Sequence, residues 1–258
     1  MLEALLGAGI VPDLVLGTSI GALNGAAVAA APTVQGVDRL RGLWADVERS
    51  GVFGGSLVDR VRHLADHRTS LHSNEPLGRL LDRAVGPVDI EDLVVPFQCV
   101  AACIETAEAT WFDRGPLRAR VLASCAVPGL LPPVEVDGLH YLDGGIVDSI
   151  PVRRAIELGA DTVYVLQAGR IEEPLRVPRR PHEVALVSFE LARRHSFATA
   201  MANRPDGVEV HVLPTGGEPV RFNDLRQLLY RDFSDVGARI DAARVASERY
   251  LATAAAPR

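Results

Sequence analysis

The chain has 258 residues, of which 48% are hydrophobic, so it can bury a sizeable core, and single α/β domains of this length are ordinary. Its formal net charge of -6 argues against nucleic acid as a partner. No stretch reaches the roughly 18 apolar residues that a membrane span needs, and no charged start followed by an apolar segment predicts a secretion signal. We therefore expect a single cytoplasmic domain over residues 1–258.

The apolar pattern alternates between segments typical of helices and segments typical of strands. Helices are expected over residues 2–7, 20–30, 37–47, 117–125, 152–158, 186–202, 223–230 and 236–255. Strands are expected over residues 14–16, 95–104, 110–112, 139–142, 162–166 and 208–213. Residues 50–75 form a looser stretch. The alternation predicts an α/β fold of three layers, in which helices cover both faces of a mostly parallel sheet.

Cysteine and histidine do not form a recognisable metal or disulfide pattern. The chain has three cysteines, and an odd, small number does not suggest a disulfide framework. Cys99 and Cys103 lie in an apolar run, where buried core positions are expected. His63 and His67 are four residues apart, but no glutamate stands beside His63 as in a zinc-protease motif. We expect no metal and no other cofactor.

A glycine-flanked serine lies between the first expected strand and the helix that follows it. The segment Gly17-Thr18-Ser19-Ile20-Gly21 has the pattern G-x-S-x-G, in which the glycines permit a tight turn that holds a serine hydroxyl outward. The start of the following helix offers free N–H groups, here that of Ile20, to a developing negative charge. The alternative is a glycine-rich structural turn.

A second segment, Asp143-Gly144-Gly145, follows the expected strand over residues 139–142. A serine hydroxyl is a poor nucleophile near neutral pH unless a base lies within hydrogen-bond distance. A partly desolvated carboxylate can be that base, because burial raises its proton affinity. Asp143 could therefore activate Ser19 if the two glycines let the chain turn towards it. A plain Asp-Gly turn is the alternative.

Together, GTSIGALNGAAVAA and SCAVPGLLPPVEVDGLHYLDGGIVDSIPVRRAIELGAD resemble the patatin-like phospholipase family over roughly residues 2–165. The resemblance implies a three-layer α/β/α fold with Ser19 as nucleophile and Asp143 as base. It also implies a phospholipid or neutral lipid ester as substrate, with transient contact at a membrane surface, and no cofactor. On the same grounds Ser124, Pro128 and Gly129 are expected to shape the wall beside the two residues.

The glycine-rich oxyanion loop of that family, with its strand, would precede the helix over residues 2–7, so we expect the first strand of the sheet to be missing. The missing loop keeps open a lipid- or acyl-binding protein without activity. Two further functions stay open because they use the same serine turn: an acyltransferase or thioesterase, and a hydrolase with a Ser-His-Asp triad. The triad would combine Ser19 and Asp143 with one of three downstream histidines: His182, His195 or His211. Substitution of these histidines separates a triad from a dyad.

Overall fold

The computed structural model describes residues 1–50, 70, 72–167, 174–175, 177–216 and 236–254. These residues form two compact units, one over residues 12–149 and one made of residues 1–11 with the chain from residue 150 onward. The single domain over residues 1–258 stays a prediction. The expected helix over residues 223–230, and His63 and His67, lie outside the described residues.

A mixed five-stranded sheet forms the centre of the unit over residues 12–149. Its strands are β1 (Val15–Thr18), β2 (Phe97–Cys103), β3 (Ala109–Phe112), β4 (Val134–Val136) and β5 (Leu139–Asp143). β1 pairs with β2 in parallel, whereas β2 pairs with β3 and with β5, and β4 pairs with β5, in antiparallel orientation. The α/β class is therefore confirmed, with more antiparallel pairing in this unit than the alternation of elements suggests.

The register places the ends of two distant strands next to each other. Cys99 and Val100 of β2 pair with both β1 and β3. Ala101 and Ala102 of β2 pair with both β3 and β5. Because a strand has only two edges, β3 occupies one edge of β2, and β1 and β5 share the other. Thr18 lies opposite Val100, and Asp143 lies opposite the next residue, Ala101. The carboxyl ends of β1 and β5 therefore meet.

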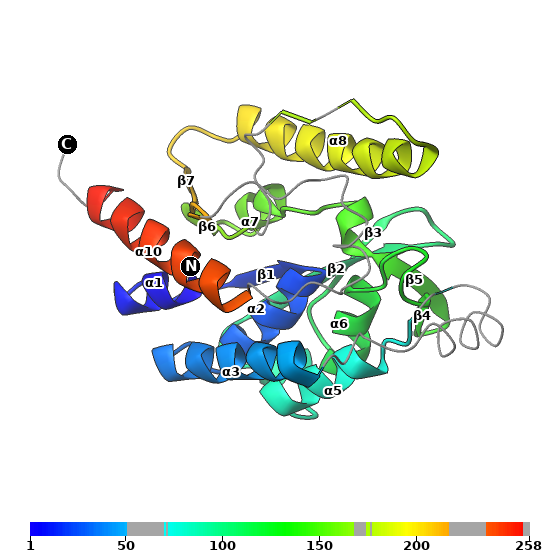
Figure 1. The fold of residues 1–258 in the computed structure, drawn as a ribbon, viewed down its shortest axis with the longest axis horizontal. Coiled ribbons are helices and arrows are strands. Elements are labelled where there is room, and N and C mark those ends of the chain that lie inside the picture. The colour runs from blue at the N-terminus through cyan, green and yellow to red at the C-terminus, as the bar shows by residue number, and fades with distance from the viewer. Residues whose placement is uncertain (51–69, 71, 168–173, 176, 217–235, 255–258) are drawn as a thin grey trace. The chain divides into compact units, whose positions relative to one another are not determined.

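Helices rich in small residues cover this sheet (Figure 1). α2 (Ile20–Ala30) packs on β1 and β2, and α6 (Leu117–Ser124) packs on β2, β4 and β5. A Cβ added at Gly25 of α2 would meet the side chains of Val15 and Phe97, so the absence of a side chain lets this helix approach the strands closely. The core is accordingly built from alanine, valine and cysteine as much as from leucine.

Two outer helices pack beside α2 and α6, and one of them was not predicted. α3 (Val34–Ser50) begins three residues before the expected start. α5 (Glu75–Ala84) lies where a looser stretch was expected to end, and it buries Leu77, Leu80 and Leu81. Pro76 occupies the first turn of α5, where its missing N–H costs no helical hydrogen bond. Short 3₁₀ turns, η1 (Ile90–Asp92) and η2 (Gly144–Ile146), complete the unit.

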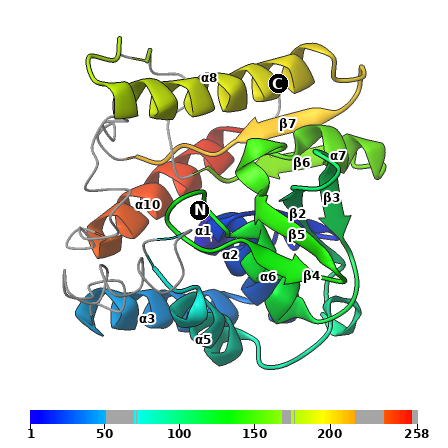
Figure 2. The same cartoon turned by 90° about the vertical axis from the view of Figure 1, so that its right-hand side faces the viewer.

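The other unit contains α1 (Leu2–Gly7), α7 (Val152–Glu157), β6 (Thr162–Val165), α8 (Pro181–Ala202), β7 (Glu209–Val212) and α10 (Val236–Ala254). β6 and β7 are parallel, as Figure 2 shows beside α7. α1 packs on α10 through a cluster that includes Leu5, Leu213 and Leu251. Among the described helices, none is both long and apolar enough to cross a membrane.

Candidate active site

Ser19 lies on a strained turn between β1 and α2. Its φ of 56° and ψ of -127° are unusual for a residue with a side chain, and such a conformation costs on the order of 1–3 kcal/mol. A Cβ added at Gly17 would collide with the backbone of Gly21 and Ala22, so glycine is required at that position. A Cβ at Gly21 would meet nothing within 4 Å, so packing does not require glycine there.

The structure brings Ser19 and Asp143 together although 124 residues separate them. The Ser19 hydroxyl donates a hydrogen bond of 2.5 Å to Oδ2 of Asp143. The second carboxylate oxygen, Oδ1, accepts a bond of 2.7 Å from the N–H of Gly145. Both oxygens are therefore engaged, and one of them lies beside the serine hydroxyl proton that a base would remove.

Burial changes the acidity of Asp143. The residue is only 4% exposed, and this desolvation raises the pKa of its carboxyl group from 3.8 to about 6, although the hydrogen bonds from Ser19 and Gly145 act in the opposite direction. The side chain is thus ionised at neutral pH but has a higher proton affinity than an exposed aspartate.

The two glycines after Asp143 serve the turn that the sequence predicted. Gly144 and Gly145 are buried in η2, which begins directly after β5. A Cβ at Gly144 would collide with the carbonyl group of Val100 in β2, so the chain can leave β5 along this path only without a side chain. Gly145 supplies the N–H that Asp143 accepts.

The start of α2 presents N–H groups beside the serine. The carbonyl oxygen of Ser19 accepts the N–H of Ala22, whereas among the described residues no acceptor is recorded for the N–H groups of Ile20 and Gly21. The first N–H groups of a helix carry partial positive charge and suit an oxyanion. The N–H of Ile20 lies at this helix start, and its role as an oxyanion donor stays a prediction.

Three hydrogen bonds around the pair were not predicted from the sequence. The hydroxyl oxygen of Ser124, at the end of α6, accepts the N–H of Ser19 at 3.0 Å. The carbonyl oxygen of Ala126 accepts the N–H of Asp143 at 2.9 Å. The hydroxyl group of Thr18 donates to the carbonyl oxygen of Asp148 at 2.8 Å. Ser124 was expected only to shape the wall of the site, and no local pattern indicates these long-range partners.

Two of the three histidines of a possible triad have side chains that the structure describes. His211 on β7 bonds to the hydroxyl group of Tyr250 and stacks on Tyr164, and His195 is exposed on α8. The side chain of His182 is not among the described ones. The hydrogen bonds recorded for the Ser19 and Asp143 side chains involve no histidine of the described part of the chain.

The cysteines lie in the core, as the sequence predicted for two of them. Cys99, Cys103 and Cys125 are buried and free. Burial raises the pKa of the Cys99 thiol, and burial together with the nearby Asp143 raises the pKa of the Cys125 thiol. Within the described ranges, no cluster of three His, Cys, Asp or Glu side chains could hold a metal ion.

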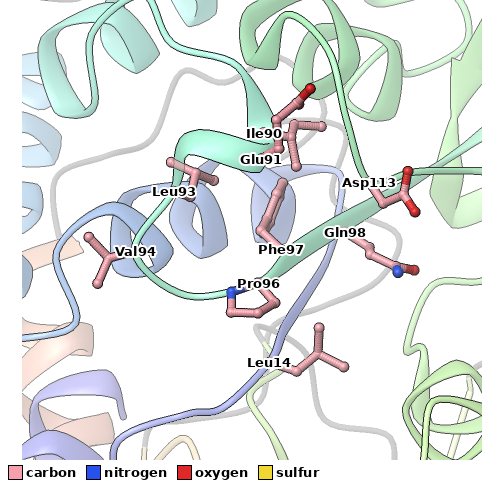
Figure 3. Close-up of a pocket in the computed structure, with 9 residues that line it drawn as sticks. All are labelled: Leu14, Ile90, Glu91, Leu93, Val94, Pro96, Phe97, Gln98 and Asp113. Atoms are coloured by element: carbon pink, nitrogen blue, oxygen red, sulfur yellow. The ribbon is translucent and has the colours of Figure 1, made fainter.

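A shallow pocket of about 490 Å³ lies at the other end of β1 (Figure 3). Its lining residues include Leu14, Glu91, Val94, Phe97 and Asp113. Leu14 precedes β1 and Phe97 begins β2, whereas Ser19 follows the last residue of β1. The pocket is therefore separate from the serine and aspartate.

Comparison with known proteins shows the family to which the chain belongs. The sequence pattern of the patatin-like phospholipase family matches residues 1–156, more than half of the chain. The chain belongs to the patatin-like phospholipase family.

Individual relatives are longer than this chain. An uncharacterized NTE family protein of Mycobacterium bovis is 43% identical over 142 residues, which cover 49% of this chain and 39% of the relative. A protein of the same description from Mycobacterium tuberculosis has the same identity and coverage. Lysophospholipase nte1 of Aspergillus terreus is 30% identical over 176 residues, which cover 67% of this chain and 11% of that protein. The chain thus spans only part of the length of these relatives.

Proposed function

We propose that the protein hydrolyses carboxylic ester bonds of lipids, with Ser19 as nucleophile and Asp143 as general base. The observation that carries this proposal is the 2.5 Å hydrogen bond from the Ser19 hydroxyl group to the buried Asp143 carboxylate, at a strained turn before a helix. Family membership supports a lipid ester, and the fungal relative is named a lysophospholipase. Such substrates lie in membranes or micelles, so the proposal includes transient contact with a lipid surface.

The first half of the reaction forms an acyl-enzyme. Oγ of Ser19 attacks the ester carbonyl carbon while its proton passes to Oδ2 of Asp143. The N–H groups of Ile20 and Gly21 at the start of α2 stabilise the negative charge on the carbonyl oxygen. The bond between the carbonyl carbon and the alcohol oxygen then breaks, and the alcohol leaves with the proton held by Asp143.

The second half releases the acid. A water molecule attacks the acyl carbonyl carbon and gives a proton to Asp143, and the bond to Oγ of Ser19 breaks as that oxygen regains a proton. A carboxylate whose pKa is near 6 suits both steps, because it is ionised at neutral pH and yet accepts a proton more readily than an ordinary aspartate.

Two substrates test this function, a short p-nitrophenyl ester and a lysophospholipid assayed by release of free fatty acid. Ser19→Ala and Asp143→Asn are each expected to lower kcat/KM by at least about 1000-fold, because each removes a member of one catalytic unit. Ser247→Ala is the control, since Ser247 is a fully buried serine whose hydroxyl group donates to the carbonyl oxygen of Pro214.

Hydrolysis that survives Ser19→Ala would contradict the proposal. Binding of lipid without hydrolysis of either ester would also contradict it, and would favour a lipid- or acyl-binding protein. Loss of activity on substitution of His182, His195 or His211 would instead favour a triad.

A further inference from the structure

One buried segment at the end of α6 bonds to the backbone of both Ser19 and Asp143. The Ser124 hydroxyl oxygen accepts the Ser19 N–H, and two residues later the Ala126 carbonyl oxygen accepts the Asp143 N–H. In sequence, these contacts join residues 105 and 17 positions apart. Neither contact belongs to a strand pairing. Both therefore act in addition to the pairing of β1 and β5 with β2, which already brings the ends of those two strands together.

The segment itself is rigid. Ser124, Cys125 and Ala126 are all at most 3% exposed, and the N–H of Cys125 bonds back to the carbonyl oxygens of Val121 and Leu122. The small side chains fit closely against the sheet, and a close-packed interior does not deform freely. A displacement of this segment would therefore move the backbones of both Ser19 and Asp143. Because the segment is fixed, it holds both backbones in place.

Ser19 needs such support because its backbone conformation is strained. Strained conformations persist only where the surrounding structure over-determines them. The carbonyl oxygen of Ser19 is held by the N–H of Ala22 within the turn, but its N–H is held by the Ser124 side chain. Among the described residues, Ser124 provides the one recorded side-chain bond to the Ser19 backbone.

We infer that Ser124 is a positioning residue. Its hydroxyl oxygen accepts the N–H of Ser19, holds the strained Ser19 backbone and so keeps the Ser19 hydroxyl group directed at Asp143. This inference rests on the proposed function and adds a residue to it. Ser124 does not touch the reacting atoms. Its effect is on the direction of the Ser19 Cα–Cβ bond, and an error of about 1 Å in such a position can cost about 100-fold in rate.

The Ser124→Ala variant removes the acceptor and adds no volume. We expect kcat to fall by about 10- to 100-fold while KM stays within about threefold, because the fully buried Ser124 side chain offers no surface to a substrate. Reaction of Ser19 with a small fluorophosphonate, followed by mass spectrometry, should slow by the same factor. Ser247→Ala, which also removes a buried hydroxyl group, should leave both rates unchanged.

Hydrogen exchange of the Ser19 amide provides a readout that needs no turnover. Because the N–H loses its acceptor, the amide should exchange at least about tenfold faster in Ser124→Ala than in the wild type, and Ser247→Ala should not change it. Should Ser124→Ala fail to fold, Ser124→Cys replaces it. Sulfur is a weaker hydrogen-bond acceptor than oxygen, so slower labelling and faster exchange are again expected.

Wild-type rates of labelling and of Ser19 exchange in the folded variant would overturn the inference. A fall in activity that matches only a loss of folded protein, with unchanged labelling of the folded fraction, would also overturn it. A wild-type protein that neither hydrolyses esters nor reacts with the fluorophosphonate contradicts the proposed function instead, and the exchange of the Ser19 amide then decides the inference alone.

Discussion

At the scale of single residues, the properties of Asp143 follow from two opposed effects. Burial disfavours its charge, whereas hydrogen bonds from Ser19 and Gly145 favour it, and burial is the larger effect. The result is a carboxyl group with a pKa of about 6. Its recorded hydrogen bonds from described residues come from the Ser19 hydroxyl group and the Gly145 N–H, and neither donor is charged. The same burial that suits it to accept a proton makes it costly for the folded state.

The pH dependence of activity should report this group. Because the base must be ionised, kcat/KM for a p-nitrophenyl ester is expected to rise with pH, with an apparent pKa of about 6, and to be constant at higher pH. A pH–rate profile from pH 4 to 9 measures it. An acidic limb near pH 4, the value for an exposed aspartate, would contradict the assigned environment.

Asp143→Asn should abolish most of the activity and raise the stability of the folded state. In the wild type the folded state binds more protons than the unfolded state between the unfolded pKa of 3.8 and the folded value of about 6, so the free energy of unfolding falls as pH rises through this window. A neutral amide removes that cost, which is at most about 3 kcal/mol for a shift of about two pKa units.

The Tm of Asp143→Asn should therefore exceed the wild-type Tm above pH 6, by several degrees at most, and the two should converge below pH 4. Calorimetry of both proteins at pH 4 and pH 7.5 measures the difference. A lower Tm for the variant at pH 7.5 would mean that the charged side chain stabilises the fold.

At the scale of elements, the site depends on two strands that end at adjacent positions of a third. β1 carries the chain to Ser19, β5 carries it to Asp143, and Val100 and Ala101 of β2 lie opposite their last residues. Each strand then needs a sharp exit. Gly17 permits the turn after β1, because without a side chain it can lie against the backbone of α2. Gly144 permits the turn after β5, because without a side chain it can lie against Val100.

Gly17→Ala tests the first exit. The added methyl group would collide with backbone atoms of Gly21 and Ala22, which cannot move aside as a flexible side chain would. We expect a loss of at least about 100-fold in kcat/KM and a Tm lower by several degrees. Gly42→Ala in α3 is the matched control, because a Cβ there would meet nothing within 4 Å and alanine favours a helix. Equal effects of the two substitutions would contradict the role given to Gly17.

The sequence indicates Ser19 and Asp143 more clearly than it indicates the contacts that hold them in place. Ser19 and Asp143 each lie in a short pattern of glycines beside an apolar run, so the local sequence indicates a sharp turn at each residue. The hydrogen bonds that Ser124 and Ala126 accept join segments far apart in sequence. They depend on the register of β2 and on the residue at which α6 ends. No spacing within either segment encodes such a contact.

At the scale of the molecule, the alternation of apolar segments is sufficient to predict an α/β fold and most of its elements. α5 was not predicted from the sequence, although Leu77, Leu80 and Leu81 have helical spacing. β4 was missed because three residues beside two prolines give no periodic signal. The antiparallel pairing of β2 with β3 and β5 follows from tertiary packing, which the order of elements leaves open.

The three buried cysteines provide a test of the packing as a whole. Cys99, Cys103 and Cys125 are all of the cysteines in the chain, and each is buried. Because burial limits both access and ionisation, the native protein should react negligibly with Ellman's reagent within minutes, and the denatured protein should show three thiols. Rapid reaction of one or more thiols in the native state would contradict the packing described for β2 and α6.

The most direct test of the central claim is to identify the residue that carries the covalent intermediate. The protein would be incubated with a fluorophosphonate and digested, and the modified peptide would be sequenced by mass spectrometry. We predict a single adduct on Ser19, absent in Ser19→Ala and formed at least about 100-fold more slowly in Asp143→Asn. An adduct on another residue, or none on a protein that hydrolyses lipid esters, would contradict the assignment of Ser19 and Asp143.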